Sequence, residues 1–579
     1  MIKKNWQKVF WLFLTLFFVF TISFHTNTQA WNQDLGRHIK LGEIILKQHK
    51  IPQVNLFSYT YPNFSFLNHH WLSEVVFALL YCWFGNSGLI VFKTLLFLVS
   101  FGLIFWLATG KAPPFLIALS SILPILTFRQ RTDFRPEIFG FLFFSFYLLI
   151  FQKAREGKQR WLWVLPILQC LWVNLHISFV FGLFLLGLYF LQMILEKRKK
   201  ISVFLPVLIA ALSVVLNPHF LRGALSPFLI WQNYGYSIAE NQSIFFLSQF
   251  GYDPNIFFFK LGLALILLSF VFSKKLLTLG FFGWLALSVV AIWQVRHFPF
   301  WALYSFLVFA DNFGVIWKRL SRRQWRKELK MGLSAFILLS VGFYGFLYCS
   351  SYYYRIHNRA VQFGFGDGQS AKRGTEFLIA HFPQNNIFNN FDIGSYLDYK
   401  IYPQMRVFCD SRPEAYPADF WQEYKEAQGN WEKWEELVGK WQIKTVFLSH
   451  TDQTPWGRQF LANIYHNITW RLVYLDDTVA IFTVKEDLPV VKLDAEKMLA
   501  DFGGNSCSLV RLANFAKFAK IIDRQDLAKV FLEKAVIMEP YSQVANLSLA
   551  TLYLDSGNSA LNFRAQALIK RARSFLFWF

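Results

Sequence analysis

Long apolar runs separated by short basic segments occupy the first 350 residues, and this pattern limits the fold more than any other feature. Most of the runs are roughly 16 to 22 residues long, about the length that a helix needs to cross a bilayer. Hydrophobic residues make up 55% of the 579 residues, and aromatic residues make up 20%. A soluble domain of this size is less apolar. We therefore expect a polytopic α-helical membrane protein.

Eleven apolar runs predict about 11 transmembrane helices. They are residues 9–25, 88–109, 112–128, 136–152, 161–174, 178–195, 201–216, 257–273, 276–293, 299–316 and 331–350. One further apolar stretch, 71–85, is short for a span, and we expect it to be an interfacial or partly inserted helix. The first run could be a signal peptide, but we favour an uncleaved first helix.

The distribution of basic residues predicts the orientation in the cytoplasmic membrane. The formal net charge is +22, which in a soluble protein would suggest nucleic acid. Here Lys and Arg gather in short loops, as cytoplasmic loops do, so we expect no nucleic-acid partner. The clusters are residues 3–8, 153–160, 197–200, 274–275 and 317–330. Placing them inside puts the N-terminus inside and everything after residue 350 outside.

Ionisable residues recur in the loops that this orientation places outside, beginning with the first outer loop, 26–70. Such groups are costly near a bilayer unless they are paired or used. A single His or Arg at a helix end can also be an interfacial anchor. By the positive-inside rule, Lys and Arg should be scarce in outer loops. Basic side chains nevertheless recur in these loops, which favours a functional site. The residues concerned are Asp34, Arg37, His38, Glu43, His69, His70, Glu74, Arg131, Asp133, Arg135, Glu137, Asn174, His176, His219, Arg296 and His297.

Several motifs in this region resemble one class of membrane enzymes. They are “DLGRHIKLGEIIL”, “PQVNLFSYTYPN”, “NHHWLSEVVFALLY”, “FRPEIFGFLFF”, “LWVNLHISFVFGLFLLG” and “LNPHFLRG”. A first span, a long outer loop with an acid and a D-L-G-x-H pattern, and many further spans are similar to the GT-C class of glycosyltransferases. The resemblance is to bacterial relatives of the dolichyl-phosphate-mannose–protein mannosyltransferase group. It covers roughly residues 9 to 350 and rests mainly on the order of the motifs and their side of the membrane.

In that class the acid of the first loop is catalytic or binds a metal, so the resemblance implies this role for Asp34. Many members have two acids close together there, whereas this chain has Gln33 beside Asp34. The departure leaves a divalent metal open as a cofactor, with Asp34 as its first candidate ligand. It also leaves open whether catalysis is retained. The five cysteines show neither metal-ligand spacing nor a disulfide framework.

The chemistry of a lipid-phosphate sugar donor fits the same residues. Transfer to a hydroxyl needs a base near the acceptor and cations on the donor phosphate. On a helix Asp34, Arg37 and His38 would share one face, and the Arg fork suits phosphate. We predict Asp34 as the catalytic residue. The predicted donor-binding residues are Arg37, His38, Arg131, Arg135, Arg296 and His297.

The chain after residue 350 is less apolar and predicts an outer region in three parts. Residues 351–374 form a linker, 375–485 a small α/β domain, and 486–579 a helical segment similar to one and a half to two tetratricopeptide units. Such helix pairs bind partners, so a protein partner is expected there. Strand-like runs are 386–391, 406–410, 444–449, 470–476 and 478–484.

The segment “FCDSRPEAY” (408–416) places Asp410, Arg412 and Glu414 just after one of these strands. We favour a structural ion pair, with a ligand-binding loop as the alternative.

We expect a membrane glycosyltransferase that moves a sugar from a polyprenyl-phosphate-linked donor to an acceptor on the outer face. Two alternatives remain open. A non-catalytic scaffold would present the helical repeats to a partner. A transporter or flippase of lipid-linked saccharides would show internal repeats and charges at the midplane of its spans. Lys93 is the main charge inside a predicted span. The sugar and the acceptor are not specified.

Overall fold

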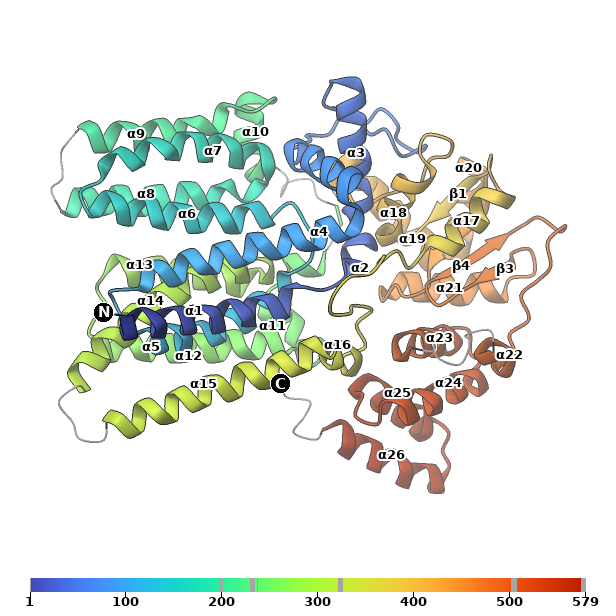
Figure 1. Ribbon diagram of the computed structural model, residues 1–579. Helices are drawn as coiled ribbons and strands as arrows, with labels where there is room; N and C mark the ends of the chain where they lie inside the picture. Colours follow the sequence, from blue (N-terminus) through green and yellow to red (C-terminus); the bar gives the residue numbers. More distant parts are fainter. Residues whose placement is uncertain are drawn as a thin grey trace.

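The computed structural model describes residues 2–196, 201–229, 235–236, 238–320, 326–500 and 508–573. A bundle of long helices forms one half of the molecule, and a mixed α/β unit with helical hairpins lies at one end of it (Figure 1). The basic segment 197–200 and residues 321–325 of the basic segment 317–330 lie outside the described residues.

The helices of the bundle follow one another through the first 350 residues. They are α1 (Ile2–Ser23), α4 (Trp71–Ala108), α5 (Pro114–Phe128), α6 (Ile138–Arg155), α7 (Val164–Leu175), α8 (Val180–Leu195), α9 (Ile201–Leu212), α10 (Phe220–Leu229), α12 (Pro254–Ser273), α13 (Leu279–Trp293), α14 (Phe298–Leu320) and α15 (Arg326–Cys349).

Length and composition identify seven spans among the described residues, or eight if the bent pair 202–215 and 220–229 is one span. The two helices of that pair meet at 85°. α5, α7 and α13 have only 15, 12 and 15 residues. The polytopic helical membrane fold is therefore confirmed, whereas the number of about 11 spans is not.

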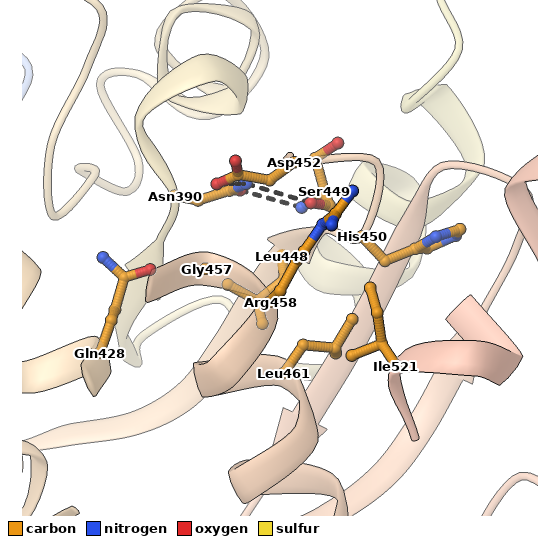
Figure 2. A pocket seen from close by; sticks show the side chains of 10 residues that line it. All are labelled: Asn390, Gln428, Leu448, Ser449, His450, Asp452, Gly457, Arg458, Leu461 and Ile521. Atoms are coloured by element: carbon orange, nitrogen blue, oxygen red, sulfur yellow. Dashed lines mark hydrogen bonds between the residues drawn. The ribbon is translucent and has the colours of Figure 1, made fainter. Parts of the chain in front are cut away.

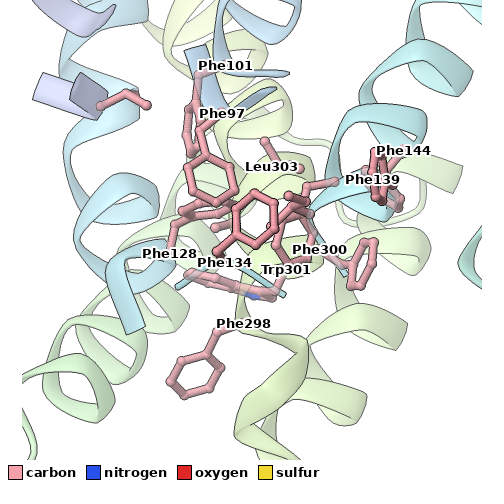
Figure 3. Packing of buried hydrophobic residues seen from close by; sticks show 14 of the residues in the cluster. Phe97, Phe101, Phe128, Phe134, Phe139, Phe144, Phe298, Phe300, Trp301 and Leu303 are labelled. Atoms are coloured by element: carbon pink, nitrogen blue, oxygen red, sulfur yellow. The ribbon is translucent and has the colours of Figure 1, made fainter. Parts of the chain in front are cut away.

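Aromatic side chains fill the centre of the bundle (Figure 3). The ring of Phe128, at the end of α5, lies 5.2 Å from Phe97 and 5.0 Å from Phe101 of α4. Phe300 of α14 stacks on Phe181 of α8 at 4.0 Å. Lipid tails are as apolar as these rings, so close packing rather than hydrophobic burial holds the spans together. This packing fixes the helix ends from which the charged loops begin.

Residues 71–84 form a helix of their own, which α4 joins to the helix 86–108 across a kink, so the separate helix predicted over 71–85 is confirmed and its interfacial position stays a prediction. The kink lies at Gly85, where the backbone is non-helical and the φ of 59° suits glycine. This part of α4 packs on α3 (Leu35–Gln48). A Cβ at Gly42 would lie 2.0 Å from the backbone oxygen of Glu74. The apolar residues that suggested a membrane surface are thus partly core residues between two helices.

The α/β unit contains one four-stranded sheet with the order β1-β2-β4-β3. The strands are β1 (Asn386–Asn389), β2 (Ile443–Ser449), β3 (Arg471–Leu475) and β4 (Val479–Thr483). β1 and β2 are parallel, and the other pairs are antiparallel. Its helices are α17 (Lys372–His381), α18 (Phe391–Ile401), α19 (Ala418–Gly429), α20 (Trp431–Trp441) and α21 (Pro455–His466).

The strand predicted over 406–410 is wrong, because these residues pair with the first outer loop and not with the sheet. Val407 forms an isolated bridge with Ser58. Its N–H donates to Phe57 O at 3.0 Å, and Tyr59 N–H donates to Val407 O at 3.1 Å. The α/β unit is thereby tied to the loop that carries Asp34.

The remaining helices connect the bundle to the end of the described chain. They are α16 (Tyr352–Ile356), α22 (Ala495–Ala500), α23 (Leu509–Ile521), α24 (Gln525–Met538), α25 (Gln543–Asp555) and α26 (Ser559–Ala572). An ion pair of 2.6 Å between Arg355 and Glu539 joins α16 to the turn after α24. The tetratricopeptide resemblance and a partner at these helices stay predictions.

Candidate active site

A polar pocket of about 170 Å³ lies where the loops of the bundle meet the α/β unit. The first outer loop, the α5–α6, α7–α8 and α13–α14 turns, the 238–241 segment and the α/β unit all line it. The structure gathers ten of the predicted residues there: Asp34, Arg37, His38, His69, His70, Arg131, Arg135, Glu137, His176 and Arg296.

Asp34 stands at the start of α3 with its carboxylate turned away from capping that helix. Its Oδ2 lies 4.0 Å from Arg135 Nη1. Its Oδ1 is buried and has no hydrogen-bond partner among the described residues. Buried carboxylate oxygens are normally paired, so an unpartnered one on a pocket wall is an acceptor left for a ligand.

The α/β unit holds the start of α3 in place. A Cβ at Gly36 would lie 2.7 Å from the backbone oxygen of Ser395 in α18, so only glycine permits this approach. Ser411 Oγ donates a hydrogen bond of 3.2 Å to the backbone oxygen of Gln33. The position of Asp34 therefore depends on contacts with residues far away in the sequence.

A carboxylate bridges the two arginines of the α5–α6 turn. Glu240, on a short 3-10 turn (Ala239–Asn241), lies 2.6 Å from Arg131 Nη1 and 2.6 Å from Arg135 Nη1. Arg131 also pairs with Glu137 at 2.6 Å, and Arg135 donates to Gln33 Oε1. Burial alone would raise the pKa of Glu240, but the guanidinium groups outweigh it and hold the pKa below its usual range.

Four imidazoles form another wall of the pocket. The ring of His70 lies 4.0 Å from His69, 5.0 Å from His176 and 5.4 Å from His38, measured between centroids. Burial lowers the pKa of each ring below the ordinary 6.5, and neighbouring arginines lower it further. Neutral imidazoles can donate and accept hydrogen bonds, which suits uncharged hydroxyl groups.

Glu74 lies beneath this wall and is fully buried. Asn68 donates a hydrogen bond of 2.7 Å to its Oε2, and His38 Nδ1 lies 3.2 Å from its Oε1. Arg37 Nη2 lies 3.3 Å from His38 Nε2. Because arginine only donates, Nε2 of His38 accepts and Nδ1 carries the proton. Glu74 therefore orients the pocket side chains without lining the pocket.

Besides Glu74, five predicted site residues do not line this pocket: Glu43, Asp133, Asn174, His219 and His297. Glu43 is exposed and pairs with Lys40 at 3.2 Å. Asn174 accepts a hydrogen bond of 2.9 Å from the Trp71 indole and is held as a helix-end brace. In both cases the residue's local partners, and not a shared cavity, account for its position.

The other three of these residues face different parts of the outer end. Asp133 faces a second charged cluster. His219 is half-buried before α10, away from the pocket. His297 is hydrogen-bonded to Gln294 at 3.0 Å and lines the adjoining apolar cavity.

Residues outside the predicted site complete the pocket. They are Gln33, Pro136, Ile177, Ile238, Glu240, Asn241, Phe391, Asp392, Ser411 and Glu414. Of these, only Ser411 and Glu414 belong to a segment that the sequence offered as a possible binding loop. Glu240 is one of two acids between residues 217 and 256, and that scarcity was an available signal. The segment “FCDSRPEAY” supplies Ser411 and Glu414. Its Asp410 and Arg412 are buried 2.6 Å apart, which confirms the structural ion pair.

A much larger cavity of about 1070 Å³ adjoins the polar pocket. Apolar residues of α8, α10 and α13 form most of its wall, including Phe181, Phe228 and Leu287. Both spaces share the side chains of Glu137, His176, Ile177, Ile238, Asn241 and Arg296. The combined space suits an amphiphilic molecule with a polar head and an apolar tail.

A small pocket in the α/β unit does not offer a comparable space. Figure 2 shows it between Asn390, Ser449, Asp452 and Arg458. Its volume of about 10 Å³ is close to that of one water position.

The polar pocket does not assemble an evident metal site. Among the residues that the structure describes, no group of three or more His, Cys, Asp or Glu is arranged to hold a metal ion. The charged neighbour of Asp34 is Arg135, and guanidinium is not a metal ligand. The residues described do not fit a divalent ion, and no chemical step is assigned to one.

Comparisons with known proteins place the fold. No family model matches the chain, and no curated protein matches its sequence. ArnT from Cupriavidus metallidurans in the apo state aligns with a TM-score of 0.51 and 12% identity, over 85% of this chain and 100% of that chain. The Archaeoglobus fulgidus oligosaccharyltransferase tethered with an acceptor peptide aligns with a TM-score of 0.50 and 12% identity, over 83% and 74%.

These alignments confirm the GT-C resemblance at the level of fold. The protein is an integral membrane protein with the fold of the GT-C glycosyltransferases.

Proposed function

We propose that the protein transfers a sugar from a polyprenyl-phosphate donor to an acceptor on the outer face of the cytoplasmic membrane. The observation that carries this proposal is that a polar and an apolar cavity adjoin and share six lining residues. The polar pocket holds an unpartnered Asp34 oxygen, and the large apolar cavity lies between helices of the bundle. The N-terminus would lie inside and the α/β unit outside.

Residues 1–350 would then form the transferase domain. The linker 351–374, the α/β domain 375–485 and the helical segment 486–579 would lie on the outer side. The α/β domain would also complete the pocket wall, because Phe391, Ser411 and Glu414 line it.

The donor would lie across both cavities. Its apolar chain suits the wall formed by Phe181 and Leu287, and its phosphate suits the arginines at the junction. Arg296 lines both spaces and donates a hydrogen bond of 2.9 Å to Asn241. Arg131 and Arg135 stand on the polar side.

Asp34 would act as the general base. Its free Oδ1 accepts the proton of the acceptor hydroxyl while the hydroxyl oxygen bonds to the anomeric carbon of the sugar. The bond between that carbon and the phosphate oxygen breaks, and the lipid phosphate leaves with the electron pair. Guanidinium groups stabilise the charge that develops on the phosphate. The neutral imidazoles of His70 and His176 can hold sugar hydroxyls.

Fold alone does not assign a reaction, so the proposal rests on the site. The test is a transfer assay in liposomes with a polyprenyl-phosphate donor that carries a labelled sugar and with an extract of envelope acceptors. We expect label on the acceptor and release of polyprenyl phosphate. Asp34→Asn keeps the size of the side chain but removes the base, and should lower transfer by about 10²- to 10⁴-fold.

Other outcomes of this assay would identify the alternatives. Movement of the labelled lipid across the bilayer without a transfer product would indicate a transporter. Neither transfer nor movement, with a folded protein, would favour a scaffold. Normal transfer by Asp34→Asn would refute the role of this residue.

A further inference from the structure

A carboxylate of the protein itself occupies the place between the two arginines proposed to bind phosphate. One oxygen of Glu240 lies 2.6 Å from Arg131, and the other lies 2.6 Å from Arg135. A phosphate held by two guanidinium groups would offer two of its oxygens in the same way. Glu240 is 22% exposed, and the arginines are 7% and 9% exposed, so the three charges form a largely desolvated set.

The segment that carries Glu240 also separates the two cavities. Ile238 and Asn241 line both of them. Besides the ion pairs of Glu240, two hydrogen bonds tie this part of the chain to the bundle: Asn241 accepts from Arg296 at 2.9 Å, and Val295 N–H donates to Gln242 O at 3.3 Å. On the other side, Tyr236 stacks on Phe391 at 4.2 Å. A ligand with its head in one cavity and its tail in the other must pass this segment.

We propose that Glu240 is an internal counter-ion, which the phosphate of a polyprenyl lipid displaces from Arg131 and Arg135 when it binds, whether as the donor's phosphodiester or as the released phosphomonoester. The inference rests on the proposed function and names the phosphate site within it. Two anions cannot share the same pair of guanidinium groups without strong repulsion. The incoming phosphate therefore replaces the carboxylate, and the 238–241 segment moves away from the junction of the cavities.

This arrangement has a physical reason in the unliganded protein. Two largely desolvated guanidinium groups without a counter-charge would be costly, and Glu240 supplies that charge until the donor arrives. Only molecules in which Glu240 has left the arginines can bind the donor phosphate. The apparent affinity for the donor is therefore the intrinsic affinity multiplied by the fraction of such molecules. Removing the carboxylate charge should therefore strengthen binding of a lipid phosphate, whereas loss of a merely structural brace should weaken it.

The test uses the full-length protein in nanodiscs and undecaprenyl phosphate as the probe. Glu240→Gln keeps the shape of the side chain and removes its charge. We expect undecaprenyl phosphate to bind roughly tenfold more tightly to this variant than to the wild type, as expected if about nine molecules in ten are closed. Unchanged or weaker binding would overturn the inference.

A second charge removal in the same pocket is the matched control. Glu414 lines the pocket and, among the residues that the structure describes, forms no ion pair with Arg131 or Arg135, so Glu414→Gln measures the general effect of one charge less. The inference requires the gain in Glu240→Gln to exceed the gain in Glu414→Gln. Equal gains would mean that long-range repulsion, and not direct occupation of the site, explains the effect.

A milder variant covers the case in which Glu240→Gln does not fold. Glu240→Asp keeps the charge but is one methylene shorter, so it cannot reach both arginines with the same geometry. Tighter binding than the wild type supports the inference, and equal or weaker binding contradicts it. The shift in unfolding temperature on adding undecaprenyl phosphate is a second readout for each variant.

Failure of the proposed function would look different. If no form of the protein binds undecaprenyl phosphate, both proposals fall. If the wild type binds it and Arg135→Ala loses it, but neither Glu240 variant gains affinity, only the counter-ion role is refuted.

Discussion

The turn between α5 and α6 faces two charged clusters, and only one of them has the features of a binding site. Arg131, Arg135 and Glu137 face the polar pocket. Arg129 and Asp133 face a second cluster beside the end of α1. Each cluster takes arginine and an acidic residue from this turn, and all five residues lie within nine positions of one segment, 129–137.

The second cluster is closed by fixed partners. Arg129 donates hydrogen bonds of 2.7 Å to Asn255 and 2.7 Å to the Tyr348 hydroxyl. His25 Nε2 lies 2.9 Å from Thr132 Oγ1. The space left is about 20 Å³, compared with about 170 Å³ in the polar pocket. Both clusters hold a buried atom without a partner among the described residues, Asp34 Oδ1 in the pocket and Arg129 Nη2 in the second cluster, so free volume is what distinguishes the candidate site.

The largest expected difference between the clusters is in catalysis. Asp34→Asn should lower transfer by about 10²- to 10⁴-fold with little change in stability. Asp133→Asn removes the one acid among the described residues of the second cavity and should keep normal transfer per folded molecule. Its effect should appear as a lower unfolding temperature. A loss of transfer in Asp133→Asn at unchanged stability would break the distinction between the clusters.

The next largest effect is expected on stability. Arg129→Ala leaves Asn255 and Tyr348 without their guanidinium partner in a site where Arg129 is 6% exposed. Loss of a buried charged hydrogen-bonding group should cost about 3 kcal/mol of unfolding free energy. Unfolding by titration with denaturing detergent measures it. Transfer corrected for the folded fraction should stay unchanged, and a selective loss of transfer would count against a structural role.

A smaller effect is expected on donor binding in the polar pocket. Arg135→Ala should weaken binding of undecaprenyl phosphate by about tenfold, the equivalent of about 1.4 kcal/mol. Arg135→Lys keeps the charge but loses the fork and should lie between the alanine variant and the wild type. The measurement is the affinity of each variant in nanodiscs for undecaprenyl phosphate. If Arg129→Ala weakens binding as much as Arg135→Ala does, the phosphate site is wrongly placed.

The smallest effect concerns pH. Burial, and then Arg296, hold the pKa of His176 well below 6.5. Below pH 6.5 the unfolded chain gains a proton that the folded His176 does not take up, so stability falls as pH falls. This residue contributes at most about 1.4 kcal/mol per pH unit. His176→Gln should therefore make stability fall less steeply between pH 6.5 and 5. An unchanged slope would mean that His176 is already charged in the fold.

Part of the candidate site could be predicted because topology constrains it. Loops that leave a helical bundle on one side must share one membrane face, so Asp34, Arg135, His176 and Arg296 were expected together. The side chains of irregular turns are less predictable. Asp133 and Arg135 are two positions apart, yet they face different cavities. An irregular turn has no fixed periodicity, so packing against distant helices decides which way each of its side chains points.

The sequence by itself determined the polytopic helical membrane fold, the order of the loops, and most strands of the α/β unit. These properties follow from local hydrophobicity, charge and alternation, which act on neighbouring residues. Only the tertiary structure decided that Glu240 bridges Arg131 and Arg135. It also decided that the α/β unit closes the pocket and that the first part of α4 packs on α3. These features depend on contacts between residues far apart in the chain. Hydropathy and charge predict on which side of the membrane a loop lies, but they do not predict which other loops it contacts on that side.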